Sequence, residues 1–132
     1  MISILLVEDH AIFAHVLVRL MARTKKMEIS KIATSAEAAL QELPGGDFDL
    51  ALVDVSLPGM NGISLVGLLH TQYPTLPCLM LSGHTPAHYV QRALQAGARG
   101  YVLKDDGLAI LDAIQRVLKG DVYVSKELGG RG

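Results

Sequence analysis

The sequence has a single cysteine, no basic region at its start and no long apolar run. Because Cys78 has no second cysteine to pair with, the chain contains no internal disulfide and suits a reducing compartment. Its apolar neighbours predict that Cys78 is a small buried side chain. The longest unbroken apolar runs, such as residues 4–7, have four residues, against about 20 for a membrane-spanning helix. We therefore predict a cytoplasmic protein with no signal peptide and no membrane segment.

Lysine and arginine are absent from residues 32–91, although five carboxylates fall there. Over the whole chain, 12 basic residues face 13 acidic ones, for a net charge of −1. Nucleic-acid-binding domains usually carry a basic stripe, and none is present here. We therefore predict that this chain does not bind DNA by itself.

The 132 residues are 50% hydrophobic and 19% charged, which predicts one folded domain with its own core and excludes a disordered chain. Several short runs are apolar at nearly every position, and such runs are typical of parallel strands buried on both faces. The predicted strands cover residues 2–7, 29–33, 48–53, 79–81 and 100–103.

Segments with helical periodicity lie between and after these strands. The residues predicted to share one face of each helix are Phe13, Val16, Leu17 and Leu20; Ala36, Ala39, Leu40 and Leu43; Ile63, Val66 and Leu69; Val90, Ala93 and Leu94; and Ile110, Ile114, Val117 and Leu118. Strands that alternate with helices predict an α/β fold: a five-stranded, doubly wound parallel sheet with five helices and right-handed crossovers.

Residues typical of helix boundaries support this division of the chain. Ser35 and the pair Thr85-Pro86 are typical of helix starts. Gly97 and Gly120 lie where helices are expected to end. No repeat, low-complexity stretch or internal linker interrupts the pattern.

Ligands of doubly wound sheets bind beyond the carboxyl ends of the strands. Five polar side chains follow predicted strands there: Glu8, Asp9, Asp54, Ser82 and Lys104. Taken singly, each is more often a cap, a turn residue or a surface residue. Three carboxylates at one sheet edge repel one another, which favours a divalent cation such as Mg²⁺. The neighbouring His10 would need further ligands in suitable geometry to make a transition-metal site.

Asp54 follows an apolar strand and begins a turn, and such a carboxylate can act as a nucleophile toward phosphorus to give an acyl phosphate. The transferred group needs a cation on one side and hydrogen-bond donors on the others. Mg²⁺ held by Asp9 and Asp54 would supply the cation. The Ser82 hydroxyl and the Lys104 ammonium would be the donors.

Four motifs in this order resemble the receiver domain of bacterial two-component response regulators over essentially the whole chain. They are LLVEDH at 5–10, DVSLPGMNG at 54–62, LSG at 81–83 and GARGYVLKD at 97–105. The resemblance implies the flavodoxin-like receiver fold. It also implies a phosphoryl acceptor and signalling switch, with slow autodephosphorylation but no enzymatic turnover.

The resemblance implies a role for each matching residue. Asp54 would be the phospho-acceptor. Mg²⁺ would be bound by Asp9, by Asp54, by Glu8 mostly through water and by the backbone carbonyl of Ser56. Lys104 would contact a phosphate oxygen. Ser82 and Tyr101 would be switch residues that move when Asp54 is phosphorylated. The implied phosphoryl donor is a phosphohistidine on a sensor histidine kinase or a phosphotransfer protein.

Some positions depart from the commonest pattern of the family. Glu8 replaces an aspartate and keeps its charge. Asp105 stands where many members have proline, often after a cis bond; a cis bond before a non-proline residue costs about 3–4 kcal/mol, so the sequence leaves this isomer open. Ser56 and His84 occupy positions that, by the resemblance, tune the rate of dephosphorylation.

The C-terminal third carries GYVLKD at 100–105, LDAI at 111–114 and GDVYVS at 120–125. These segments resemble the NarL/FixJ subfamily, whose members usually continue into a helix-turn-helix DNA-binding domain. We therefore predict a receiver domain at residues 1–121, and a C-terminal tail or the start of a linker at 122–132. DNA would be bound only through a domain absent from this chain. A homodimer and a stand-alone receiver are both left open.

Three rival functions need features that this sequence lacks. A Mg²⁺-dependent phosphohydrolase with an Asp54 nucleophile would need a second aspartate two residues on, where Ser56 stands. A pseudo-receiver that only binds other proteins would normally have lost the acceptor, the acidic pair or the lysine. A flavodoxin-type flavin domain would need a phosphate-binding loop after the first strand, where Glu8 and Asp9 have the wrong charge.

Overall fold

The structure, a computed structural model, describes residues 1–83 and 87–125. Their strands form one parallel sheet in the order β2-β1-β3-β4-β5-β6. The strands are β1 (Ile2–Val7), β2 (Met27–Ala33), β3 (Leu50–Asp54), β4 (Cys78–Ser82), β5 (Gly100–Leu103) and β6 (Tyr123–Val124). The helices are α1 (Ala11–Thr24), α2 (Ala36–Glu42), α3 (Gly62–Gln72), α4 (Ala87–Ala96) and α5 (Gly107–Leu118), with a short 3₁₀ turn at Leu43–Gly45.

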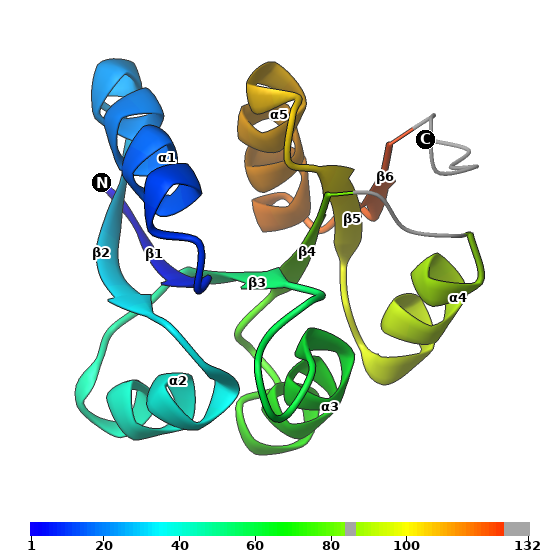
Figure 1. The fold of residues 1–132 in the computed structure, drawn as a ribbon. Coiled ribbons are helices and arrows are strands. Elements are labelled where there is room, and N and C mark those ends of the chain that lie inside the picture. Colours follow the sequence, from blue (N-terminus) through cyan, green and yellow to red (C-terminus); the bar gives the residue numbers. More distant parts are fainter. Residues whose placement is uncertain (84–86, 126–132) are drawn as a thin grey trace.

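Helices cover both faces of the sheet, as Figure 1 shows, with α1 and α5 on one face and α2, α3 and α4 on the other. Alternate residues of one strand therefore enter different cores. In β1, Ile4 and Leu6 pack with α1 and α5, whereas Leu5 and Val7 pack on the opposite face. All four are fully buried, which explains why the central strands are apolar at nearly every position.

The predicted α/β architecture is confirmed, but the prediction of five strands is wrong because the sheet has six. The additional strand, β6, pairs in parallel with β5, with Tyr123 opposite Gly100 and Val124 opposite Tyr101. It lies within residues 122–132, which were expected to be a tail or linker. A strand of two residues is too short to show the alternation from which strands are recognised.

The face of α1 differs from the one predicted. Leu17 is buried as expected, but Ala14 and Met21 share its face, and Val16 is 55% exposed. Apolar residues occur around most of this helix, so their spacing along the sequence fits either of two overlapping helix faces. The prediction chose the face with the larger side chains and left out the small Ala14. Phe13 and Leu20 are partly buried at the margin of the same core.

The predicted helix boundaries that lie in the described residues are confirmed. The Ser35 side chain accepts a hydrogen bond from the amide of Ala38 and caps α2. Gly97 and Gly120 follow α4 and α5 with φ of 120° and 99°, a backbone conformation that favours glycine. The pair Thr85-Pro86, predicted to start α4, and the tail residues 126–132 lie outside the described part of the chain.

Cys78 begins β4 and is buried, as its neighbours predict. Burial raises the pKa of its thiol to about 12, so the sulfur is held as a neutral thiol near pH 7. Among residues 1–83 and 87–125, no helix is both long and apolar enough to span a membrane.

Candidate functional site

The polar residues predicted from the strand ends meet at one edge of the sheet. In the register, Val7 pairs with Val53, Asp54 pairs with Leu81, and Ser82 pairs with Leu103. Glu8 and Asp9 therefore follow β1 at the level where Asp54 ends β3. Lys104 follows β5 on the far side of β4, and its backbone amide donates to the Ser82 carbonyl at 2.9 Å.

The Lys104 side chain reaches across β4 to two buried carboxylates. Its Nζ lies 2.7 Å from Glu8 Oε1 and 3.1 Å from Asp54 Oδ2. Both carboxylates are almost completely inaccessible to solvent, and Lys104 is mostly buried with them. Two buried negative charges side by side are costly unless a cation compensates them, and Lys104 is a cation placed to do so.

Two further effects act on the Lys104 ammonium. Burial lowers its pKa, but hydrogen bonds to Glu8 and Asp54 and the charges of these carboxylates outweigh that effect, so the pKa is raised above its ordinary value. The ammonium also lies 4.8 Å from the centre of the Phe13 ring on α1, within the range of a cation–π contact. Lys104 is therefore held as a charged group that points into the acidic cluster.

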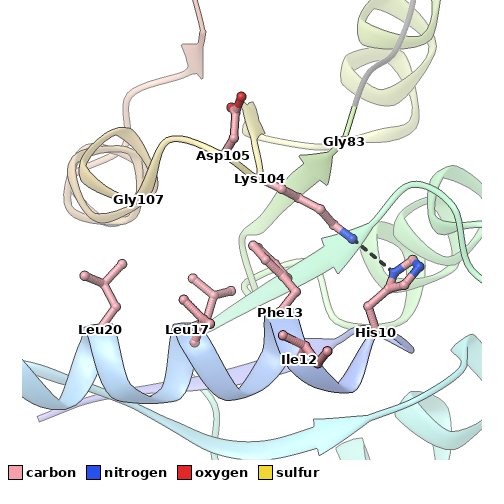
Figure 2. Close-up of a pocket in the computed structure, with 10 residues that line it drawn as sticks. His10, Ile12, Phe13, Leu17, Leu20, Gly83, Lys104, Asp105 and Gly107 are labelled. Carbon is pink, nitrogen blue, oxygen red and sulfur yellow. Dashed lines mark hydrogen bonds between the residues drawn. The ribbon is translucent and has the colours of Figure 1, made fainter.

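His10, the residue before α1, belongs to the same cluster. Its backbone amide and its Nδ1 each lie 3.0 Å from Glu8 Oε2. The same Nδ1 lies 3.6 Å from Asp9 Oδ1, 3.9 Å from Asp54 Oδ2 and 3.5 Å from Lys104 Nζ. Figure 2 shows the imidazole turned toward the end of the Lys104 side chain.

The loop after β3 fixes the position of Asp54. The amide of Ser56 donates to Asp54 Oδ1 at 3.0 Å, so one carboxylate oxygen faces the loop while the other faces Lys104. The amide of Gly62 donates to the Val55 carbonyl at 3.1 Å. A Cβ at Gly62 would collide with the carbonyl oxygen of Asp54, so the close return of this loop requires glycine.

The cluster fits a divalent cation. Glu8, Asp9, His10 and Asp54 each offer one ligand atom, and the four atoms lie within 4.8 Å of one another. Three of the four are carboxylate oxygens, the ligand type that Mg²⁺ prefers. Asp9 is exposed, so the cluster is open to solvent on one side and leaves room for water ligands.

The two residues expected to switch are both buried. Ser82 is the last residue of β4, next to the strand that carries Asp54. Tyr101 is fully buried in β5, where it pairs with Met80. The Lys104–Asp105 peptide is trans, because no cis bond occurs in the described part of the chain. His84, which was expected to affect dephosphorylation, falls outside that part.

Sequence reasoning missed two contributors to this site. Phe13 was assigned only to the core face of its helix, and no local signal connects it with Lys104. Gly62 was read as part of a motif without a structural role. Its position just after Asn61, which caps α3 through a hydrogen bond to the Ser64 amide, is a signal for a tight turn into the helix.

An apolar groove opens beside the cluster (Figure 2). Its volume is about 710 Å³, and α1 forms one wall while the segment from Lys104 to Gly107 forms the other. The α1 wall includes Ile12, which is 83% exposed, and Val16. Leu108, at the start of α5, is 79% exposed as well. Apolar side chains are thus open to solvent next to the charged site.

An acidic cluster and a lysine lie at the carboxyl ends of the strands of a parallel α/β fold. This combination defines a class of domain, and the similarity of the sequence to known proteins shows which class it is. The profile of the response regulator receiver domain family matches residues 4–120. The chain therefore belongs to the response regulator receiver domain family, as its motifs predicted.

Individual relatives agree with this assignment. The chain is 35% identical over 121 residues to the DNA-binding transcriptional activator DevR/DosR of Mycobacterium tuberculosis, covering 91% of the chain and 56% of the relative. It is 31% identical over 124 residues to the transcriptional regulatory protein DegU of Brevibacillus brevis, and the aligned part covers 93% of this chain and 52% of that protein. The chain thus spans about half the length of these relatives.

A solved structure supports the same family. The crystal structure of a LuxR-family two-component response regulator from Aurantimonas sp. SI85-9A1 matches with a TM-score of 0.91 at 27% identity, covering 96% of this chain and 91% of that one.

Proposed function

We propose that Asp54 accepts a phosphoryl group from a phosphohistidine and that this modification switches an output surface of the domain. The observation that carries the proposal is the buried Asp54 carboxylate at the end of β3, 3.1 Å from the Lys104 ammonium and inside an acidic cluster. An Asp54 oxygen forms a bond to phosphorus while the bond from phosphorus to the donor nitrogen breaks. The electron pair of the broken bond leaves with the donor imidazole.

The surrounding residues have separate roles in this transfer. Asp9, Asp54, Glu8 through water and the Ser56 carbonyl would hold Mg²⁺, in agreement with the cation-sized spacing of the cluster. When bound, Mg²⁺ supplies positive charge to the phosphoryl oxygens. Lys104 is placed to exchange its contact with an Asp54 oxygen for one with a phosphoryl oxygen. The amide of Ser56 orients Asp54 from the other side.

Phosphorylation is read out through Ser82 and Tyr101. A new dianionic group at Asp54 attracts the Ser82 hydroxyl from the neighbouring strand, and the space it leaves is filled by the Tyr101 ring. A local change of charge would thereby bias the surface formed by α4, β5 and α5 between two arrangements. Both residues are buried, Ser82 in the strand beside β3 and Tyr101 in the next strand, β5, and this proximity supports the coupling.

The partners follow from the same role. The donor is a sensor histidine kinase or a phosphotransfer protein in the cytoplasm, and we place its docking surface in the apolar groove beside Lys104. The receiver includes β6, which pairs with β5, and the chain beyond this strand would lead toward an output domain. Because the relatives are transcriptional regulators about twice as long, that output is DNA binding through a separate domain, with a homodimer as a further assembly.

The test is the intact mass of the protein after incubation with acetyl phosphate, with and without Mg²⁺, beside an Asp54→Asn variant. We expect one phosphoryl adduct that requires Mg²⁺ and is lost in the variant. An adduct that persists in Asp54→Asn would mean that another carboxylate is the acceptor. Absence of both an adduct and Mg²⁺ binding would favour a pseudo-receiver, and continuous hydrolysis of a chromogenic phosphate ester would favour a phosphohydrolase.

A further inference from the structure

The acidic cluster contains a nitrogen donor as well as oxygen donors. His10 Nδ1 lies 3.0 Å from Glu8 Oε2, 3.6 Å from Asp9 Oδ1 and 3.9 Å from Asp54 Oδ2. The imidazole thus faces all three carboxylates. His10 precedes α1, and its backbone carbonyl accepts a hydrogen bond from the amide of Ala14 at 3.0 Å.

These separations are close to those of ligands around one metal ion. Ligand atoms about 2.1 Å from a six-coordinate cation lie about 3.0 Å apart when adjacent and about 4.2 Å apart when opposite. The distance of 3.0 Å to Glu8 Oε2 equals the separation of adjacent ligands, and the distances of 3.6 Å to Asp9 Oδ1 and 3.9 Å to Asp54 Oδ2 lie within about 0.6 Å of one of the two values. A cation at the centre of the cluster would therefore find a nitrogen ligand already within reach.

We propose that His10 is a ligand of the divalent-cation site and determines which cation the site prefers. The inference rests on the proposed function, because it uses the same acidic cluster. Imidazole nitrogen binds Co²⁺ and Ni²⁺ far better than it binds Mg²⁺, which takes oxygen ligands. The site therefore binds Ni²⁺ much more tightly than its three carboxylates alone would, while its affinity for Mg²⁺ depends little on His10.

The contact with Lys104 is compatible with this role. Lys104 Nζ lies 3.5 Å from His10 Nδ1 and 2.7 Å from Glu8 Oε1, so the ammonium and a cation compete for the same donors. Only 15% of the Lys104 side chain is exposed, yet its length allows the amine to move toward a phosphoryl oxygen when a cation enters.

The experiment is titration of the tag-free protein with Mg²⁺ and with Ni²⁺ by calorimetry, for the wild type, His10→Ala and His15→Ala. His15 is a matched control, because it is an exposed histidine on α1, the helix that follows His10. We expect His10→Ala to weaken Ni²⁺ binding about tenfold or more and to change Mg²⁺ binding by less than about twofold. His15→Ala should leave both affinities unchanged.

Other outcomes separate the possible errors. Equal losses for Mg²⁺ and Ni²⁺ in His10→Ala would mean that His10 only positions Glu8, and an unchanged Ni²⁺ affinity would mean that it is no ligand; either result overturns the proposal. If Asp54 still gains a phosphoryl group with Mg²⁺ in these cases, the proposed function stands without the inference. Addition of Co²⁺ should also shift the ring resonances of His10 far more than those of His15.

Discussion

Lys104 compensates two buried carboxylates with one ammonium, and this arrangement predicts what its removal does. In Lys104→Met, Glu8 and Asp54 keep their burial but lose the cation at 2.7 and 3.1 Å. Loss of one partner of a buried ion pair costs about 3–5 kcal/mol. We expect urea unfolding without divalent ions to show a loss of about 3 kcal/mol in the free energy of unfolding. A saturating concentration of Mg²⁺ should restore a large part of this loss, because the bound cation then compensates the carboxylates.

The control is Lys119→Met, which removes an exposed lysine beyond the end of α5. This change should leave the free energy of unfolding within about 0.5 kcal/mol of the wild type. If Lys104→Met and Lys119→Met proved equally stable, Lys104 would not be compensating the buried carboxylates.

At the scale of single residues, the sequence predicts which groups meet but not every contact they make. Glu8, Asp54 and Lys104 could be placed together because parallel strands bring their carboxyl ends to one edge. The contact between Lys104 and the Phe13 ring depends on how closely α1 approaches the segment after β5. That approach is set by packing of distant parts of the chain, for which the sequence carries no local signal.

The strand β6 is held against β5 by contacts that require a glycine. A Cβ at Gly100 would lie 2.7 Å from the Tyr123 carbonyl oxygen and 2.5 Å from a methyl carbon of Leu79. In Gly100→Ala, the Leu79 side chain can shift within the core, but the backbone of β6 must move away. We expect a loss of about 1–3 kcal/mol in stability and separation of β6 from the sheet.

Amide hydrogen exchange measures this separation. The amides of Tyr123 and Ser125 donate to the carbonyls of Arg99 and Tyr101 at 3.0 Å, so both should lose protection in Gly100→Ala. The amides of β1 and β3 should stay protected. Gly45→Ala is the control, because a Cβ there meets no atom within 4 Å; protection of Ser125 that survives in Gly100→Ala would contradict the expectation.

At the scale of elements, long periodic segments could be predicted and short ones could not. Each of the five longer strands was recognised, with ends that differ by at most two residues. Burial on both faces demands apolar runs in the central strands, whereas the edge strand β2 is mostly exposed and gives a weaker signal. Residues Val122 to Val124 are rich in β-branched and aromatic types, a weak strand signal after Gly120. The signal is weak because the strand depends on β5 as its neighbour more than on its own sequence.

The arrangement of the whole domain places an apolar surface beside a charged site. Sequence patterns predicted the α/β architecture and the shared edge of the sheet, since connection rules leave few topologies open. They did not predict the groove between α1 and the segment from Lys104 to Gly107. A groove depends on the separation of elements, which follows from side-chain packing throughout the domain rather than from any one segment.

This groove predicts a difference between large and small phosphoryl donors. Ile12 lies on the groove wall and is 83% exposed, so Ile12→Glu should not disturb folding. It removes an apolar contact with a docked donor protein. A loss of about 1.4 kcal/mol in the binding free energy of that protein slows phosphoryl transfer about tenfold when the concentration of the kinase limits the rate. Acetyl phosphate needs no such contact, so its rate of phosphorylating Asp54 should stay the same. The measurement compares initial rates with a phosphorylated sensor kinase and with acetyl phosphate.

Val122→Glu provides the matched control for Ile12→Glu. Val122 is 53% exposed, lies between α5 and β6 and is not part of the groove wall, so its substitution should leave both rates unchanged. Equal slowing of both donors by Ile12→Glu would place the effect at Asp54 rather than at docking. Unchanged rates with both donors would show that the donor protein binds elsewhere. Selective slowing with the kinase alone would connect the apolar groove to the choice of partner and the charged cluster to the chemistry, two functions that the fold sets side by side.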